Sequence, residues 1–363
     1  MSEVQVKREP LTYREDGAHS FFGDLIESNR GDFEARERIT RHAMETRTNP
    51  TGTAGTGGEF DPPGWLIDRW AGPARAGRVL ADITPTAPLP AGVSSINVPK
   101  LTTGSLTGVQ PGQGTPPVSQ DWVSTSNKSN VVTIAGQLDV SIQIAEQTPS
   151  NPGFDAVAYT DLVRDYNAQL EQQMINGTGT NGQLLGLSNF TVASGHSISG
   201  SSVVTTTTDG VAVLWPLLGQ AFAAVGNDRK LAPEAWLLAP RRWAFIASSL
   251  DTSHRPIASP HSEHHLSDSP LGGSAQPVGS LLGVPVYLSG AVIPTAASAD
   301  TAYAIRPSDT VLFEGAPKLM MVVNSLSGTL QVRFSLRRYV AFVGNRFSGG
   351  LAMITGMPQP TNF

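Results

Sequence analysis

The stretch NPGFDAVAYTDLVRDYNAQLEQQMINGTGTNGQLLGLSN, residues 151–189, carries the most regular hydrophobic pattern in the chain. Apolar side chains recur at spacings of three and four residues from Phe154 to Met174, which predicts one long amphipathic helix over residues 154–175. Roughly 20 helical residues span about 30 Å. A helix of that length with one continuous apolar face is expected to lie across a sheet or subdomain.

Three glycines after this helix match the G-x-G-x-x-G spacing of a dinucleotide-binding loop, namely Gly177, Gly179 and Gly182. That motif requires a strand before it, a helix after it and an acidic residue about 20 positions further on. Here a helix precedes the glycines, and no acidic residue follows until Asp209. We therefore interpret Asn176 and Gly177 as a left-handed cap of the helix, and the later glycines as a tight reversal.

The composition indicates a folded protein with a weakly charged surface. Hydrophobic residues make up 39% of the 363 residues and charged residues only 15%, with a net charge of −5. This balance does not favour nucleic-acid binding. The absence of cysteine excludes disulfides and thiolate metal sites. The sequence shows neither a membrane-spanning run nor a signal-peptide core, so we expect synthesis and folding in a cytoplasm and no membrane partner.

The N-terminal third predicts an arm followed by a projecting hairpin. Residues 32–47 form a charged helical pattern, and residues 48–64 are a linker or arm rich in Gly, Thr and Pro. A strand at residues 95–99 and an alternating segment at residues 131–147 flank residues 101–130, whose only charges are Asp121 and Lys128. Two strands joined by such an uncharged excursion predict an extended hairpin that needs a surface to lie on.

Beyond residue 183 the pattern becomes mixed α/β. We expect residues 211–225 to be helical apart from Pro216, residues 232–240 to centre on a buried strand, and residues 241–251 to form a helix. Further strands are expected at residues 283–293, 301–307 and 318–324, with two or three more in residues 329–356. No internal repeat is visible. Helices and strands are thus both expected, and the fold class that we predict is α+β.

Candidate catalytic and metal sites are weak. The one histidine cluster comprises His254, His261, His264 and His265. It lacks the H-E-x-x-H order and a helical setting, so a surface loop is favoured over a metal site. Asp161 and Asp165 are interpreted as a solvated helix face. No serine-nucleophile or P-loop motif occurs. We predict no enzyme activity, no cofactor and no metal.

A basic group on the C-terminal strands has two interpretations. Arg333 and Arg337 would share one face of a strand, with Arg338 and Arg346 nearby. A contact between subunits is favoured over a wall that binds anions or nucleic acid, because the net charge gives no support for DNA binding. Trp122, in the uncharged excursion, is a further candidate for a contact between subunits.

The ordered motifs resemble the major capsid proteins of tailed bacteriophages, which have the Hong Kong 97 (HK97-like) fold. The resemblance covers about residues 60–360 and is most specific in INGTGTNGQLLGLSN at residues 175–189. The other matching motifs are ARAGRVLADI (74–83), VVTIAGQLDVSIQIAEQ (131–147), WLLAPRRW (236–243) and LLGVPVYLS (281–289).

The resemblance implies a set of domains. These are an N-terminal arm (1–58), an N-terminal part of the P-domain region (59–96), an extended E-loop (97–130), a P-domain with the spine helix (131–182), an A-domain (183–317) and C-terminal strands of both domains (318–363). It also implies self-assembly into the hexamers and pentamers of an icosahedral shell around double-stranded DNA, which is contacted only non-specifically. Scaffold, portal and decoration proteins would be partners, with assembly in the host bacterial cytoplasm and a final location in the virion.

The sequence departs from the family pattern at two places. In some members, an isopeptide bond between a lysine of the E-loop and an asparagine crosslinks the shell. Here Lys100 and Lys128 flank the loop with none between them, and the C-terminal GTLQVRF has no partner residue, so we predict no such crosslink. Only about 58 residues precede the matching core, which leaves a separate scaffold protein and processing of the N-terminus both open.

Two other functions are alternatives to the capsid interpretation. An encapsulin-like shell that stores cargo enzymes would share the fold, but the long arm and the thirty-residue loop favour the capsid. A hydrolase or nucleotide-binding enzyme using the histidine loop or the glycines is the remote alternative.

Overall fold

The computed structural model describes residues 12–13, 18–45, 72–141, 143, 153–203, 207–250, 276–292, 299–323 and 331–360. The chain divides into two compact units, Met1–Leu66 and Ile67–Phe363. Among the described residues, no helix is both long and apolar enough to span a membrane.

The described residues of the N-terminal unit form two helices, α1 (Phe21–Asn29) and α2 (Phe33–Glu45). The hydroxyl of Ser20 caps α1 by accepting a hydrogen bond from the Gly23 N–H at 3.1 Å. Arg38 of α2 donates two hydrogen bonds to the carboxylate of Asp24, at 2.8 and 2.9 Å. Helix α2 confirms the charged helix predicted from residues 32–47.

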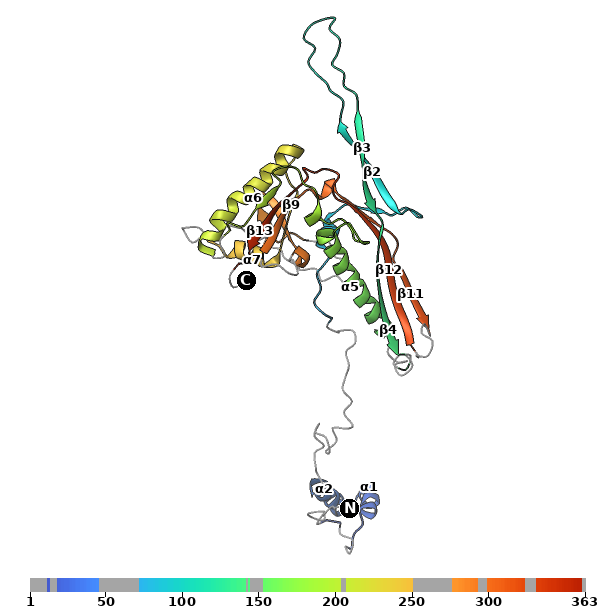
Figure 1. Cartoon of the computed structure of the whole chain (residues 1–363). Coiled ribbons are helices and arrows are strands. Elements are labelled where there is room, and N and C mark those ends of the chain that lie inside the picture. Colours follow the sequence, from blue (N-terminus) through green and yellow to red (C-terminus); the bar gives the residue numbers. More distant parts are fainter. Residues whose placement is uncertain are drawn as a thin grey trace. The chain divides into compact units, whose positions relative to one another are not determined.

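The first sheet of the larger unit has the strand order β1-β10-β12-β11, with β4 pairing along β12. Its strands are β1 (Thr86–Pro88), β4 (Val132–Ser141), β10 (Val311–Glu314), β11 (Lys318–Val323) and β12 (Gln331–Val343). Helix α5 (Gly153–Asn176) packs along β4 and β12 (Figure 1). Tyr166, Leu170 and Met174 are buried against this sheet's core, so the long amphipathic helix is confirmed.

The second sheet has the strand order β5-β13-β9-β6-β8-β7. Its strands are β5 (Ser197–Ser199), β6 (Ala235–Leu238), β7 (Gly279–Leu281), β8 (Val284–Leu288), β9 (Ala299–Ile305) and β13 (Leu351–Pro358). Helices α6 (Thr207–Arg229) and α7 (Pro240–Ser248) pack against this sheet (Figure 1). Buried side chains of both helices and of the sheet form one hydrophobic core. The strands and helices predicted after residue 183 are confirmed, with two strands in residues 329–356.

Pro216 lies inside α6 and does not interrupt it, contrary to the expectation of a break. Its flanking residues Leu214 and Leu218 are both 1% exposed, so burial holds the helix on either side. Pro216 and Ala212 are exposed. The carbonyl of Ala212, which loses its helical donor, therefore faces water that can replace the missing hydrogen bond.

The projecting hairpin is present, but its strands differ from the expected ones. Strands β2 (Ser95–Thr103) and β3 (Val123–Asn130) pair antiparallel and extend away from both sheets (Figure 1). The return begins at Val123, eight residues earlier than the alternating segment suggested. Strand β3 is exposed along most of its length, so its sequence lacks the apolar alternation that would predict a half-buried strand.

The hairpin is anchored at its base. The side-chain amide of Asn127 donates to the carbonyl of Asn345 at 2.7 Å, and the hydroxyl of Ser129 donates to the carbonyl of Phe342 at 2.8 Å. After Val131 the chain continues directly into β4 of the first sheet. The hairpin's direction is therefore fixed by the first sheet, while its far end, residues 104–122, makes a loop.

Candidate assembly surfaces and the buried polar centre

The turn after α5 depends on close backbone approach at Gly177. Its N–H donates to the Gln173 carbonyl at 3.0 Å, which continues the helical pattern, and its φ lies outside the left-handed region. A Cβ at Gly177 would lie 2.2 Å from the Leu184 carbonyl oxygen. The predicted left-handed cap at Asn176 and Gly177 is therefore wrong. The left-handed residues come later, including Gly179 at φ 75° and Gly182 at φ 76°.

The backbone amides of this turn are used within it. The N–H of Thr178 donates to the Gln183 side-chain oxygen at 3.1 Å, and the N–H of Gly179 donates to the Leu184 carbonyl at 2.9 Å. After the turn comes a single 3-10 turn, η3 (Leu187–Asn189), where the phosphate motif would need a helix. The glycine spacing thus reflects a turn closed on itself, as the sequence context indicated.

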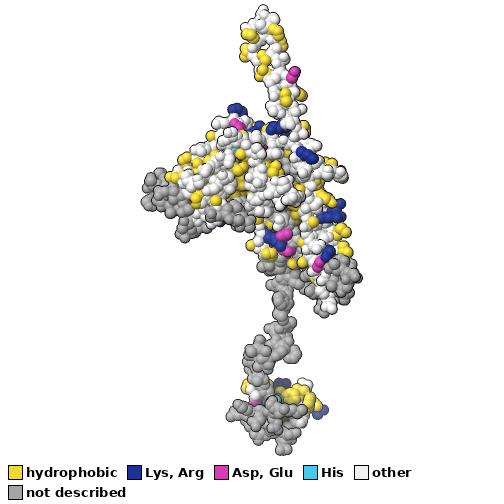
Figure 2. Space-filling view, viewed as in Figure 1, with side chains coloured by type: hydrophobic (Ala, Val, Ile, Leu, Met, Phe, Trp, Pro, Cys, Tyr) yellow, Lys and Arg dark blue, Asp and Glu magenta, His cyan; other side chains and the backbone are white. Residues whose placement is uncertain are grey.

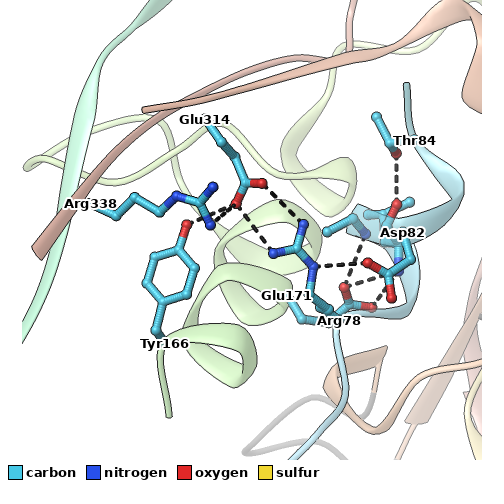
Figure 3. Close-up of polar contacts among 9 residues, drawn as sticks. Arg78, Asp82, Thr84, Tyr166, Glu171, Glu314 and Arg338 are labelled. Carbon is cyan, nitrogen blue, oxygen red and sulfur yellow. Dashed lines mark hydrogen bonds and ion pairs between the residues drawn. The ribbon is translucent and has the colours of Figure 1, made fainter. Parts of the chain in front are cut away.

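A buried polar centre joins the start of the larger unit to the first sheet and α5 (Figure 3). Glu314, at the end of β10, lies 3.1 Å from Arg78 and 3.2 Å from Arg338 of β12. The hydroxyl of Tyr166 in α5 donates to the same carboxylate at 2.9 Å. Arg78 also pairs with Asp82 at 2.9 Å. One carboxylate thus holds three elements that are far apart in the sequence.

The charged groups of this centre stabilise one another in a site that is largely buried from solvent. Burial and the neighbouring Glu314 carboxylate raise the pKa of Tyr166, which keeps its phenol protonated as a donor. Burial opposes the charge of Arg78, but its pairing with Glu314 outweighs burial and raises the pKa. Burial raises the pKa of Asp82, although Arg78 beside it opposes that change. Removing Glu314 would leave the buried Arg78 with Asp82 alone and would take from Arg338 its carboxylate partner in this centre.

Glu171 forms a second buried contact on the next turn of α5 and is fully buried. Its carboxylate accepts hydrogen bonds from the N–H of Leu80 at 2.9 Å, the N–H of Ala81 at 3.4 Å and the hydroxyl of Ser289 at 2.8 Å. The first two belong to the short helix α3 (Val79–Ile83). Burial raises the pKa of Glu171 to about 7, although these donors favour the ionised form.

A third polar centre underlies the second sheet. Asp300 of β9 is fully buried and pairs with both Arg241 and Arg242 of α7. Arg242 also donates to the carbonyl of Pro358, at the end of β13. These residues and Glu171 were missed from the sequence. No local pattern signalled them, because glutamines follow Glu171 and small or polar residues flank Asp300, so neither carboxylate stands out as buried.

The four C-terminal arginines do not act as one group. Arg333 pairs with Asp139 of β4 at 2.6 Å, and Arg337 is exposed on the same face of β12. Arg338 lies on the opposite face, in the polar centre around Glu314. Arg346 lies over the ring of Phe347 at 5.6 Å. Arg337 is therefore the member of this set with the most accessible charge.

Other predicted residues lie as follows. The indole of Trp122 is 68% exposed and donates to the Ser105 hydroxyl at 2.7 Å. Asp161 and Asp165, interpreted as a solvated face, lie 2.9 and 3.5 Å from Arg75 and are only partly exposed. The histidine cluster lies outside the described residues. Within the described part, no group of three or more His, Asp or Glu residues could hold a metal ion.

Among the described residues of the larger unit, several exposed large apolar side chains lie on the β2–β3 hairpin and on strand β11. The first is the hairpin surface, defined as Leu101, Leu106, Val109, Val118, Trp122 and Val123, where Val109 is 94% exposed. The second is the edge strand β11, where Leu319, Met320, Met321 and Val322 are 38–55% exposed. Figure 2 shows the hairpin with scattered hydrophobic side chains and few charged ones. Exposed apolar side chains that lie close together, and uncovered edge strands, are typical of surfaces that contact other proteins.

Comparison with solved structures places the fold. A chain from Mycobacterium phage Adephagia matches with a TM-score of 0.60 and 14% identity, covering 86% of this chain and 99% of that one. The capsid of a native GTA particle matches at 0.59 and 14%, covering 85% and 99%. The holo-SrpI encapsulin complex from Synechococcus elongatus matches at 0.57 and 14%, covering 84% and 96%. These likenesses support the α+β, HK97-like fold.

No curated protein sequence matches the chain. The family model described as "Phage capsid family" matches residues 78–343, from Arg78 of the polar centre to the last residue of β12. That span covers most of the larger unit, including the hairpin, α5, the whole first sheet and every strand of the second sheet except β13. The chain therefore belongs to the phage capsid family.

Proposed function

We propose that this chain is the major capsid protein whose copies form the hexamers and pentamers of an icosahedral shell around double-stranded DNA. The observation that carries the proposal is the β2–β3 hairpin in a member of this family. It extends from the subunit, exposes apolar side chains and has almost no charge. Such a surface is complete only when it lies on another protein.

The hairpin is suited to lie on a neighbouring copy. Covering a charged surface would require removing water from each charge, which costs several kcal/mol per unpaired ion. Between Thr103 and Val123 the only charge is Asp121. The side chains are chiefly Gly, Thr, Ser, Pro and Gln, so one loop can be covered in hexamers and pentamers with slightly different contacts.

The domain assignments follow from this role. We assign the first sheet with α5 to the P-domain, the second sheet with α6 and α7 to the A-domain, and the hairpin to the E-loop. Arg337 and Trp122 are the exposed candidates for contacts between subunits. Portal, scaffold and decoration proteins are proposed partners, and assembly is proposed in the bacterial cytoplasm. With no lysine in the loop between Lys100 and Lys128, we propose a shell without lysine–asparagine crosslinks.

An encapsulin-like compartment is the second candidate, because an encapsulin has the same fold at a similar TM-score. The two functions differ in what the shell contains. A capsid encloses DNA, whereas an encapsulin-like shell would enclose a cargo enzyme.

The test is electron microscopy of the purified protein and of its source particles, with nucleic-acid and protein analysis of their contents. The proposal predicts closed icosahedral shells tens of nanometres across, with DNA inside the source particles. Shells that hold one co-purified enzyme and no DNA would favour the second candidate. Small oligomers that never close would exclude both. A covalent ladder on denaturing gels would overturn the absence of crosslinks.

A further inference from the structure

The N-terminal unit exposes more large apolar side chains than its two helices bury. In α1 and α2 the buried residues are Asp24 and Ala35. The exposed large apolar residues of the unit are Phe21, Phe22, Leu25, Ile26, Phe33 and Met44. Figure 2 shows hydrophobic side chains gathered on one side of this unit. It lies outside the residues matched by the capsid family model, which begin at residue 78.

A unit of this size needs help to stay folded. Its helices have 9 and 13 residues, and helices shorter than about 12–15 residues are marginal in water on their own. Very small domains are usually completed by disulfides, metals or oligomerisation. The chain has no cysteine, and the described residues contain no metal-binding group. Association is the remaining means of burying the apolar surface.

The outward face of α2 has the pattern of a helix–helix contact. Phe33, Glu37, Thr40 and Met44 follow one another at spacings of four, three and four residues, which places them on one stripe. Phe33 is 81% exposed and Met44 is 71% exposed, at opposite ends of the stripe. A shallow hollow of about 340 Å³ lies beside Phe33 and is also lined by Glu34, Arg36, Glu37 and Thr40.

We propose that this α2 face, defined as Phe33, Glu37, Thr40 and Met44, pairs antiparallel with the same face of a second copy of the chain. A two-fold axis near residues 38–39 places Phe33 opposite the partner's Met44. The partner's Met44 then also lies against the hollow beside Phe33. The same arrangement brings Glu37 near the partner's Arg41. These two residues already form an i,i+4 pair within one helix at 3.4 Å, so pairing creates alternating charges at the rim.

A second copy is favoured over another partner because the two-fold arrangement sets Glu37 of each copy against Arg41 of the other, so the face is complementary to itself in charge. In a shell, many copies of the chain are held close together, so identical faces meet at high effective concentration. Only this last step rests on the proposed function.

The absence of cysteine allows a direct test on the full chain. Thr40→Cys places one reactive thiol near the proposed axis, at an exposed position. Glu27→Cys places the control thiol at an exposed position on α1. A short bis-maleimide reagent is added, and covalent dimers are measured on denaturing gels. We expect at least about fivefold more dimer from Thr40→Cys than from Glu27→Cys, because paired faces hold the thiols together.

A second substitution separates pairing from chance encounter. Adding Phe33→Asp to Thr40→Cys should abolish the excess dimer, whereas adding Asn29→Asp, which introduces the same charge elsewhere on the unit, should preserve it. Equal dimer from both cysteine variants, or dimer that survives Phe33→Asp, would overturn the inference. Particle formation is followed by electron microscopy in the same samples. Shells without excess dimer refute this inference alone, and excess dimer without shells refutes the proposed function alone.

Discussion

The polar centre around Glu314 and the loop of the β2–β3 hairpin solve opposite problems. In the polar centre, Glu314 and its partners Arg78 and Arg338 lie about 3 Å apart with side chains at most 23% exposed. In the loop, Val109 is 94% exposed and Trp122 68% exposed. The first region is complete within one chain. The second is incomplete there, which indicates that the sequence divides its residues between building the subunit and joining it to neighbours.

The largest loss of subunit stability is expected from a substitution at Gly177. Gly177→Val places a branched side chain where even a Cβ would be 2.2 Å from the Leu184 carbonyl oxygen. We expect a loss above about 4 kcal/mol, in the range of exceptional substitutions, measured as loss of soluble folded protein or by denaturant unfolding. Gly182→Ala is the control. It has open space and a φ of 76°, so it should cost only about 1–2 kcal/mol. Equal effects would contradict the close-approach account.

The next effect is expected at the polar centre. Glu314→Ala leaves Arg78 and Arg338 without their shared carboxylate, and breaking a buried pair costs about 3–5 kcal/mol. Asp139→Ala breaks the more exposed pair with Arg333 and should cost less than about 1 kcal/mol. Denaturant unfolding of both variants measures the difference. Similar losses would show that the centre around Glu314 is no more important than a surface pair.

Glu171 should make stability depend on pH. Its pKa is raised from 4.5 to about 7, so its contribution is fully present below about pH 4.5 and is lost as pH rises through 7. A shift of this size corresponds to roughly 3 kcal/mol. We expect the free energy of unfolding of the wild type to fall between pH 5 and pH 8 relative to that of Glu171→Gln, which does not titrate. If the free energies of unfolding of the two proteins change with pH in parallel, Glu171 is not the source of the pH dependence.

The smallest effect on the subunit is expected at the hairpin surface. Val109→Asp changes an exposed side chain and should alter the free energy of unfolding by less than about 0.5 kcal/mol. It should nevertheless weaken assembly, because the new carboxylate must lose water when the loop is covered. Melting temperature and sedimentation measure the two outcomes. Val203 is 2% exposed, so Val203→Asp is the matched buried control, and it should destabilise the subunit itself.

The sequence predicts much of the fold because periodic apolar residues report burial. The stripe ending at Met174 located α5, and the apolar segment around Trp236 located β6. Strand β3 escaped prediction because its side chains are exposed on both faces. The prediction that Pro216 interrupts the helix was wrong, because helix propensity is local and does not include the burial of Leu214 and Leu218.

The functional features divide in the same way. The uncharged loop was visible in composition, since a long charge-poor excursion is rare. The polar centres were not, because their partners are brought together only by the fold. Arg78 and Glu314, for example, are 236 residues apart in the sequence. Gly177 was recognised as a turn residue for the wrong reason, since spacing reveals a glycine but not whether φ or close contact requires it.

The most direct test of the central claim replaces residues 104–122 with an Asn-Gly turn that closes β2 onto β3. The account predicts an unchanged melting temperature and soluble subunits or small oligomers that fail to form closed shells under conditions where the wild type does. Closed shells from the shortened chain, matching the wild type by electron microscopy, would contradict the claim that the hairpin completes its contacts on a neighbouring copy.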